Sequence, residues 1–120
     1  MQKRIHIVED DSDIRYIICY MLTELDYEVK ISDSIADYRT HAVNFDADLI
    51  LMDVMLADGN GLDLCLELKT APQTKHIPII MMSAHVTEAT YILNSCANDF
   101  ISKPFDIENL TELIKKFMVA

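Results

Sequence analysis

The chain has 120 residues, 51% of them hydrophobic, which is enough apolar material for the core of a single domain spanning residues 1–120. Twenty acidic and ten basic residues give a formal net charge of −10, which disfavours direct contact with nucleic acid or an anionic membrane because such contact is largely electrostatic. The chain shows no basic-then-apolar leader and no apolar run of membrane-spanning length, and its cysteines, Cys19, Cys65 and Cys96, are widely spaced, so we expect a soluble cytoplasmic protein with reduced thiols.

Short apolar segments alternate with longer segments of helical period along the chain. The predicted strands are Ile5–Val8, Glu28–Ser32, Leu49–Met52, Ile77–Met82 and Asp99–Ser102. The predicted helices are Ile14–Leu25, Ser34–Phe45, Gly61–Thr70, Val86–Cys96 and Ile107–Met118. Ser12 or Asp11 is expected to cap the first helix, and Asp106 the last.

Five strands in alternation with five helices predict an α/β fold with a doubly wound parallel sheet, because a barrel of such units needs roughly 250 residues. Right-handed crossovers place the carboxyl ends of all five strands at the same edge of the sheet. Binding sites in open sheets of this kind form at that edge.

Polar residues follow four of the five predicted strands. They are Glu9, Asp10 and Asp11 after the first strand, Asp53 after the third, Ser83 after the fourth and Lys103 after the fifth. Each has an ordinary explanation on its own, because the acidic triplet could be a solvated turn and helix cap, and the others a turn aspartate, a loop hydroxyl and a surface lysine. Their convergence at one edge favours a functional site.

The charges of this set indicate its chemistry. Three close carboxylates, those of Glu9, Asp10 and Asp53, repel one another, and a hard cation such as Mg²⁺ offsets that repulsion while keeping positions open for phosphoryl oxygens. Asp53 can then act as a nucleophile that forms an acyl phosphate. Phosphoryl transfer needs positioning and charge neutralisation, which the Lys103 ammonium and the Ser83 hydroxyl can supply.

Four segments together resemble the receiver domain of two-component response regulators, and the resemblance runs from Arg4 to about Met118. They are IHIVEDD, LILMDVML followed by Gly61-Leu62, IPIIMMSA and ANDFISKPF. The resemblance implies a flavodoxin-like sheet with strand order 2-1-3-4-5. It also implies that Asp53 is the phosphoacceptor, which takes a phosphoryl group from a phosphohistidine on a histidine kinase or a histidine phosphotransfer protein.

The same resemblance implies roles for the other residues at the strand ends. Asp10, Asp53 and the backbone carbonyl of Met55 would ligate Mg²⁺ (or Mn²⁺), with Glu9 acting mostly through water. Ser83 and Lys103 would contact the phosphoryl oxygens, and the Lys103–Pro104 bond would be cis, which X-Pro bonds adopt at a cost of about 1 kcal/mol. The domain would catalyse only its own phosphorylation and dephosphorylation, and would not be an enzyme acting on an external metabolite.

A conformational switch is also implied. Ser83 would move toward the phosphoryl group, and Phe100 would rotate inward past the small Ala84, although a core aromatic is the ordinary explanation of Phe100. The surface formed by the last two predicted helices and the last strand would then change its partner preference and control an unidentified output. A homodimer through that surface is a further option.

Several residues depart from the family pattern or remain open. Ala57 stands where proline is usual, Asn60 replaces an aspartate, and Cys96 replaces a glycine that often ends the fourth helix, at a cost in stability if a positive φ is needed there. His85 is either a solvated loop histidine or, with the side chain of Met55, a residue that tunes dephosphorylation.

Other classes of protein use parts of this pattern. A phosphatase of the haloacid-dehalogenase kind has an aspartyl nucleophile, but its DxD motif follows the first strand. A degenerate receiver that only binds partners would lack part of the acidic, serine and lysine set. A flavin-binding electron carrier would need a phosphate-binding loop rich in Ser, Thr and Gly after the first strand.

Overall fold

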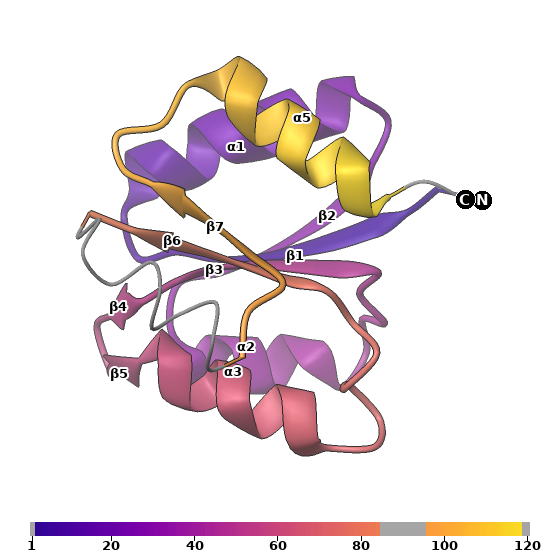
Figure 1. Cartoon of the computed structure of the whole chain (residues 1–120), viewed down its shortest axis with the longest axis vertical. Coiled ribbons are helices and arrows are strands. Elements are labelled where there is room, and N and C mark those ends of the chain that lie inside the picture. The colour runs from indigo at the N-terminus through magenta and orange to yellow at the C-terminus, as the bar shows by residue number, and fades with distance from the viewer. Residues whose placement is uncertain (1, 85–95, 119–120) are drawn as a thin grey trace.

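The computed structural model describes residues 2–84 and 96–118, which form a sheet with helices on both faces (Figure 1). In chain order the elements are β1 (Arg4–Val8), α1 (Ser12–Glu24), β2 (Glu28–Ser32), α2 (Ile35–Ala42), β3 (Leu49–Asp53), β4 (Met55–Leu56), β5 (Gly59–Asn60), α3 (Gly61–Thr70), β6 (Ile79–Ser83), β7 (Asp99–Ser102) and α5 (Ile107–Phe117). The predicted helix Val86–Cys96 lies outside the described residues except for its last one. No helix in the described ranges is long and apolar enough to cross a bilayer.

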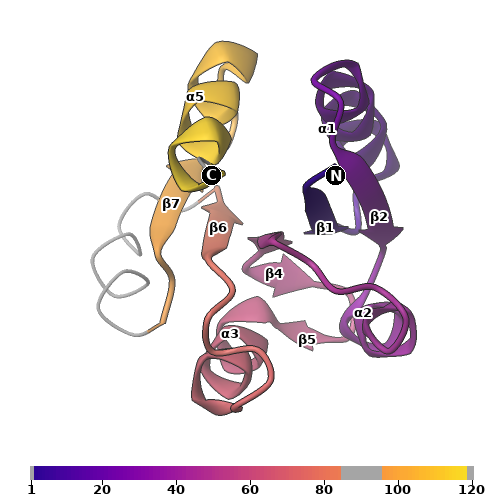
Figure 2. The ribbon, with the colours of Figure 1, turned by 90° about the vertical axis from the view of Figure 1, so that its right-hand side faces the viewer.

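The main sheet has five parallel strands in the order β2-β1-β3-β6-β7. Because β4 and β5 form a separate small sheet, this is the predicted order 2-1-3-4-5, and the flavodoxin-like fold is confirmed. Figure 2 shows α1 and α5 on one face of the sheet and α2 and α3 on the other. Because the sheet is covered on both faces, its central strands are largely apolar along their length, with His6 of β1 as a buried exception.

The central strand β3 shows how the sequence produces this arrangement. All five of its residues are buried, which explains the unbroken apolar run before Asp53. Side chains alternate between the faces of a strand, so Leu49 and Leu51 join the core beneath α1 and α5, whereas Ile50 and Met52 join the core beneath α2 and α3. The site at the end of β3 therefore rests on two packed cores.

Short polar side chains begin the helices. Asp11 rather than Ser12 caps α1, because its carboxylate accepts the backbone N–H groups of Asp13 and Ile14. Asp106 caps α5 as predicted. The end of β1 thus passes directly into a helix whose start is fixed.

The segment after Asp53, for which no strand was predicted, forms regular structure. Met55 pairs with Asn60 and Leu56 with Gly59, forming a small antiparallel hairpin of β4 and β5. Asn60 then caps α3 through a bond of 2.8 Å from the backbone N–H of Leu62 to its side-chain oxygen. The replacement of aspartate by Asn60 therefore preserves a helix cap.

Candidate functional site

Three strand ends meet at one ammonium group. The Nζ atom of Lys103, just beyond β7, lies 2.8 Å from Oδ2 of Asp53 at the end of β3 and 2.5 Å from Oε1 of Glu9 at the end of β1. All three side chains are largely buried, and the most exposed of them, that of Lys103, is 16% exposed. The predicted convergence of an acid-bearing first strand, Asp53 and Lys103 is therefore present.

Glu9 is fully buried. One carboxylate oxygen accepts the Lys103 ammonium and the other accepts the backbone N–H of Asp11 at 3.1 Å. Burial, helped by the negative charge of Asp53, raises the pKa of Glu9 to about 7 in spite of these two bonds. Two carboxylates thus share one ammonium, and their negative charge is only partly balanced.

Lys103 is held in place by the backbone on both sides. Its N–H donates to the carbonyl oxygen of Ser83 at 2.8 Å, and the Lys103–Pro104 peptide bond is cis, as the resemblance implied. Burial alone would lower the pKa of Lys103, but hydrogen bonds to Asp53 and Glu9 outweigh it and raise that pKa. The side chain is therefore a fixed cation at the site.

The acidic side chains suit a hard divalent cation. Glu9, Asp10 and Asp53 each offer a carboxylate oxygen, and these oxygens lie within 4.8 Å of one another. Asp10 is exposed, whereas the other two are buried, so the group opens toward solvent on one side. Oxygen donors, surplus negative charge and an open side are the features of a Mg²⁺ site that keeps room for another ligand.

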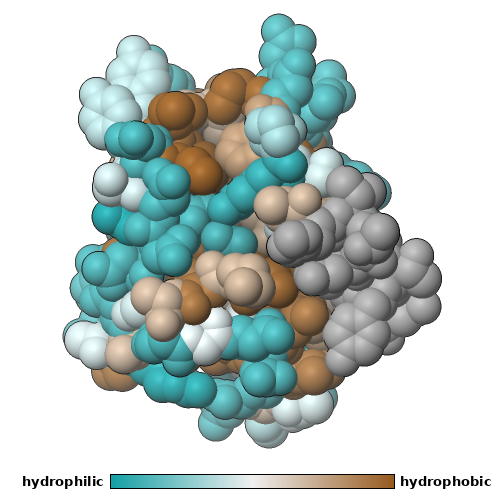
Figure 3. Space-filling view, turned by 90° about the vertical axis from the view of Figure 1, so that its left-hand side faces the viewer, coloured by the Kyte–Doolittle hydropathy of each residue, from teal (hydrophilic) through white to brown (hydrophobic). Residues whose placement is uncertain are grey.

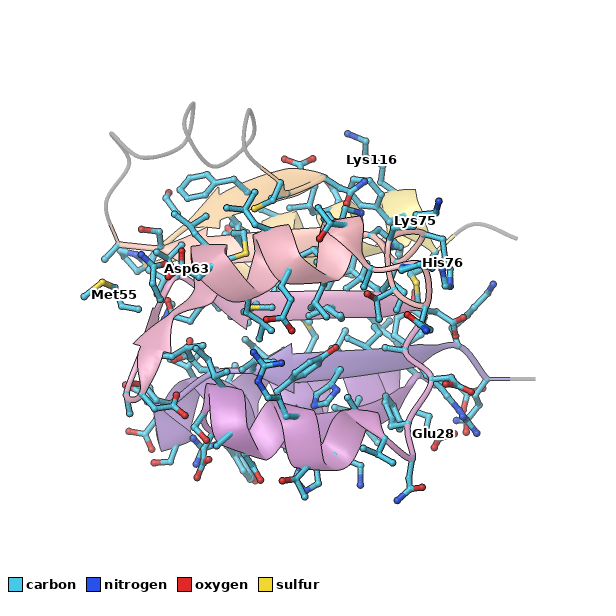
Figure 4. The ribbon with its side chains drawn as sticks, turned by 90° about the horizontal axis from the view of Figure 1, so that it is seen from below. Glu28, Met55, Asp63, Lys75, His76 and Lys116 are labelled. Atoms are coloured by element: carbon cyan, nitrogen blue, oxygen red, sulfur yellow. The ribbon has the colours of Figure 1, made fainter. Side chains whose placement is uncertain are left out.

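Met55 lies beside the carboxylate of Asp53. Its backbone N–H is 3.3 Å from Oδ1 of Asp53, and its side chain is 63% exposed and projects outward at the edge of the molecule (Figure 4). The same view places Lys75 and His76 at the opposite end of the sheet. Met55 therefore borders the approach to Asp53, while its role as a metal ligand stays a prediction.

Ser83 and Phe100 lie on the neighbouring strands. Ser83 ends β6 and is 1% exposed, and it pairs in register with Ser102 of β7. Phe100 is half-buried and packs against the core beneath α2 and α3, while Ala84 is exposed. His85, for which a tuning role was an alternative, lies outside the described residues.

Sequence reasoning missed a residue that anchors the hairpin. The carboxylate of Asp58, between β4 and β5, accepts the backbone N–H groups of Ile35 and Ala36 at 2.8 and 3.0 Å. These are the first two residues of α2, so the loop after Asp53 is fixed to the start of another helix. An acidic residue in a turn is a weak signal, because its partner is distant in sequence.

An apolar hollow of about 430 Å³ lies beside Lys103. Its lining includes Ile14 and Ile17 of α1, Pro104 and Phe105 in the segment before α5, and Ile107 at the start of α5. Figure 3, which views the edge where the strands end, shows apolar surface in its upper part and hydrophilic side chains across its middle. An apolar surface thus adjoins the charged site.

Comparison with protein families gives a match to the response regulator receiver domain over residues 5–115. The chain is 34% identical over 122 residues to the phosphate regulon transcriptional regulatory protein PhoB of Escherichia coli (strain K12). The aligned region covers 98% of this chain and 52% of PhoB. It is 36% identical over 117 residues to the transcriptional regulatory protein KdpE of Staphylococcus aureus, covering 96% of this chain and 49% of KdpE. The chain spans about half the length of these curated relatives.

Solved structures give the same result. A receiver domain of the sensor histidine kinase PA1611 from Pseudomonas aeruginosa PAO1, which holds a magnesium ion in its active-site cleft, matches with a TM-score of 0.86 and 25% identity over 98% of each chain. A CheY-like response regulator receiver domain protein from Methanospirillum hungatei JF-1 matches with a TM-score of 0.87 and 28% identity, covering 97% of this chain and 93% of that one.

Proposed function

The chain belongs to the response regulator receiver domain family, and we propose that it accepts a phosphoryl group on Asp53 from a phosphohistidine of a histidine kinase or a histidine phosphotransfer protein. One observation carries the proposal: the Lys103 ammonium joins the carboxylates of Asp53 and Glu9 at the meeting point of three strand ends. A structural ion pair would not need a third carboxylate, Asp10, beside it.

In this proposal Asp53 is the nucleophile. One of its carboxylate oxygens attacks phosphorus, the new P–O bond forms as the P–N bond breaks, and the imidazole nitrogen keeps the electron pair of the broken bond. Lys103 and the Ser83 hydroxyl neutralise charge on the phosphoryl oxygens. Hydrolysis of the acyl phosphate then restores Asp53, so the domain processes only its own modification and is not an enzyme for an external metabolite.

Mg²⁺ fits the acidic group, and we assign its ligands to Asp10, Asp53 and the backbone carbonyl of Met55, with Glu9 acting through water. When bound, the ion supplies charge neutralisation for the phosphoryl group and the carboxylates. Glu9 contributes a buried negative charge that favours a cation at this place. Met55, with its exposed side chain, and His85 tune the access of water to the acyl phosphate.

The apolar hollow beside Lys103 supports the assignment of a protein donor. A phosphohistidine must reach Asp53 within bonding distance, so its carrier must cover the surface around the site. Ile17 is 50% exposed and Ile107 is 39% exposed on the rim of the hollow, and apolar contacts there would position a helical partner. A small phosphodonor would not use this surface.

The output follows from a change around Ser83 and Phe100. Because Phe100 is half-buried against a packed core, a shift of Ser83 toward the phosphoryl group would favour a second packing of that ring. The surface that includes β7 and α5 would then bind an output domain, an output protein or a second copy of the chain. Signalling of this kind would take place in the cytoplasm.

A phosphodonor assay tests the proposal. The protein is incubated with Mg²⁺ and acetyl phosphate, and intact mass is followed beside Asp53→Asn and beside Asp63→Asn, which removes an exposed carboxylate from α3 (labelled in Figure 4). We expect a single phosphoryl adduct on the natural chain and on Asp63→Asn, lost with chelator and absent from Asp53→Asn. Catalytic release of phosphate from many equivalents of donor would favour a phosphatase, and no Asp53-dependent adduct or beryllofluoride binding would leave only a partner-binding module.

A further inference from the structure

A cavity of about 450 Å³ opens where α2 and α3 end. Its walls come from α2, from the segment between α2 and β3, and from the turn between α3 and β6, which carries His76. Figure 4 places His76 at the end of the sheet opposite Met55, so the cavity is remote from Asp53. Its volume lies within the range of small-molecule sites, about 300–1,000 Å³. The proposed phosphoryl chemistry and the proposed switch do not use this cavity.

The inner wall of the cavity is aromatic and apolar. Tyr38 of α2 lines it together with Phe45 and Ile77, and all three residues are buried. The rings of Tyr38 and Phe45 pack on the fully buried His6 of β1, with their centroids 4.7 and 5.7 Å from the centroid of its imidazole. Because this packing does not depend on a ligand, the aromatic wall is preformed. Such a wall favours a planar ring, which it can contact by stacking or edge to face.

The hydroxyl of Tyr38 is unpaired in this wall. Among residues 2–84 and 96–118 it has no hydrogen-bond partner, although the residue is only 5% exposed. It is not sealed in the core, because in the same ranges the sealed polar atom without a partner is Nδ1 of His6. The hydroxyl therefore faces the cavity that Tyr38 lines. Burial raises the pKa of Tyr38, so its hydroxyl stays protonated and can both donate and accept a hydrogen bond.

Polar side chains surround the mouth of the cavity. Asp46, Gln73 and His76 are exposed there, and their side chains have no partner among the described residues. They offer a carboxylate that accepts, an amide that both donates and accepts, and an imidazole. No lysine or arginine in the described part of the chain lines the cavity, and Asp46 belongs to a chain with a net charge of −10. A phosphate or carboxylate ligand is therefore disfavoured.

We propose that this cavity is a binding site for a neutral heteroaromatic base, either free or carried on a nucleoside. The planar base would contact Tyr38 and Phe45, and the Tyr38 hydroxyl would bond to a ring nitrogen or a carbonyl oxygen on its inner edge. Asp46 would accept an N–H group of the base, and Gln73 would bond to the rest of its polar edge. Proteins commonly bind single bases by aromatic contact combined with hydrogen bonds to the base edge. This site does not rest on the proposed function.

A titration of the full chain in metal-free buffer tests the proposal. Amide proton–nitrogen NMR spectra are recorded with adenosine, guanosine, cytidine and uridine, and then with the 5′-triphosphate of the nucleoside that binds most tightly. Without a divalent cation, the triphosphate cannot bind through a metal ion at Asp53. We expect at least one nucleoside to shift the signals of Phe45, Ala47 and Ile77 saturably, with a Kd below about 1 mM. The triphosphate should bind at least about tenfold more weakly.

Two pairs of variants assign the contacts. Tyr38→Phe removes only the inner hydroxyl and should weaken nucleoside binding about three- to tenfold, whereas Tyr16→Phe, at an exposed tyrosine of α1, should not weaken it. Asp46→Asn removes the carboxylate at the mouth and should weaken binding by a similar factor, and its control is Asp63→Asn at an exposed position of α3. Because Asp46 is exposed, its variant tests the site even if Tyr38→Phe lowers the stability of the fold.

Several results would overturn the proposal. They are the absence of a saturable shift with all four nucleosides, shifts confined to residues around the apolar hollow beside Lys103, and equal binding of the nucleoside and its triphosphate. Equal affinity of the natural chain, Tyr38→Phe and Asp46→Asn would also overturn it, since the cavity would then make no contact that holds the base. Labelling of Asp53 by acetyl phosphate is scored separately, so its failure does not affect this outcome.

Discussion

Asp58 accepts a hydrogen bond of 2.8 Å from the backbone N–H of Ile35, which joins the hairpin after Asp53 to the first residue of α2. A second bond from Ala36 and the N-cap Ser34 complete the helix start. This anchor gives the loop a fixed position although Ala57 replaces the more rigid proline. We therefore expect the hairpin to be ordered by a tertiary contact rather than by a restricted backbone.

The first prediction concerns the loss of the hydrogen bonds that Asp58 accepts from α2. Asp58→Ala leaves two helix-terminal N–H groups without their carboxylate, and we expect the thermal unfolding midpoint to fall by about 3–5 °C. Asp58→Asn keeps one acceptor oxygen, so its unfolding midpoint should lie between those of Asp58→Ala and the natural chain. Glu112→Gln, an exposed position on α5, controls for the change in charge, and an equal shift in that control would contradict the role of Asp58.

The second prediction concerns the ammonium between two carboxylates. Lys103→Met leaves the buried Glu9 and Asp53 facing each other without their shared cation, and we expect the free energy of unfolding in metal-free buffer to fall by about 2–3 kcal/mol. Added Mg²⁺ should stabilise this variant more than the natural chain, because the acidic group has then lost the ammonium that joins Glu9 to Asp53. Urea unfolding with and without Mg²⁺ measures both effects.

Lys116→Met is the matched control for Lys103. Lys116 is 67% exposed and its ammonium lies 3.5 Å from a carboxylate oxygen of Asp99, so its loss should cost at most about 1 kcal/mol and should not alter the effect of Mg²⁺. If Lys116→Met and Lys103→Met lose the same free energy of unfolding, the Lys103 ammonium does not stabilise the buried carboxylates of Glu9 and Asp53 more than a surface ion pair would.

The five long strands and the edge at which Glu9, Asp53 and Lys103 meet could be predicted because they follow from local pattern and crossover handedness. Runs such as Leu49–Met52 are long enough to show that both faces of a strand are buried. Parallel connection then forces their ends together without any knowledge of side-chain packing. This is why the candidate site could be assembled from the sequence while its distances could not.

The β4–β5 hairpin could not be predicted in the same way. Strands of two residues have no periodicity to detect, and their pairing depends on Asp58 reaching a helix that is distant in sequence. That Cys96 packs against the core that contains Cys65 is equally hidden, because it depends on how the turn before β7 packs against α3 and the sheet. Both are tertiary facts that local patterns do not carry.

The third prediction concerns Gly61, the first residue of α3 and a part of the family pattern. A Cβ atom at this position would lie 2.1 Å from the backbone oxygen of Asp53, a distance that requires the backbone to move. We expect Gly61→Ala to cost about 3 kcal/mol in the free energy of unfolding and to disturb the position of Asp53. Ala57→Gly, in the same segment, changes only chain entropy and should cost less than about 1 kcal/mol. Equal losses of stability in Gly61→Ala and Ala57→Gly would mean that the close approach of Gly61 to the backbone of Asp53 does not restrict the residue at position 61.

The fourth prediction is a pH dependence that arises from His6 in β1. This side chain is fully buried between the rings of Tyr38 and Phe45, and its Nε2 lies 2.7 Å from Oγ of Ser32. Burial, and after it the electrostatic interactions with His41 and Lys30, lower the pKa of His6 to about 4, although Asp37 opposes them. The folded chain therefore keeps His6 neutral at pH values at which the unfolded chain protonates it.

Because the unfolded state binds this proton at the higher pH, stability should fall as the pH drops from about 6.5 to about 4, and the contribution of His6 between pH 7 and pH 5 should be about 2 kcal/mol. Carboxylates also make the free energy of unfolding depend on pH. The informative quantity is therefore the difference in that free energy between the natural chain and His6→Gln, measured by urea unfolding at each pH. His6→Gln should be less stable at pH 7 but lose less stability on acidification. His76→Gln, at an exposed histidine, should follow the natural chain. If His6→Gln and the natural chain lose stability in parallel, His6 does not remain neutral in the folded core.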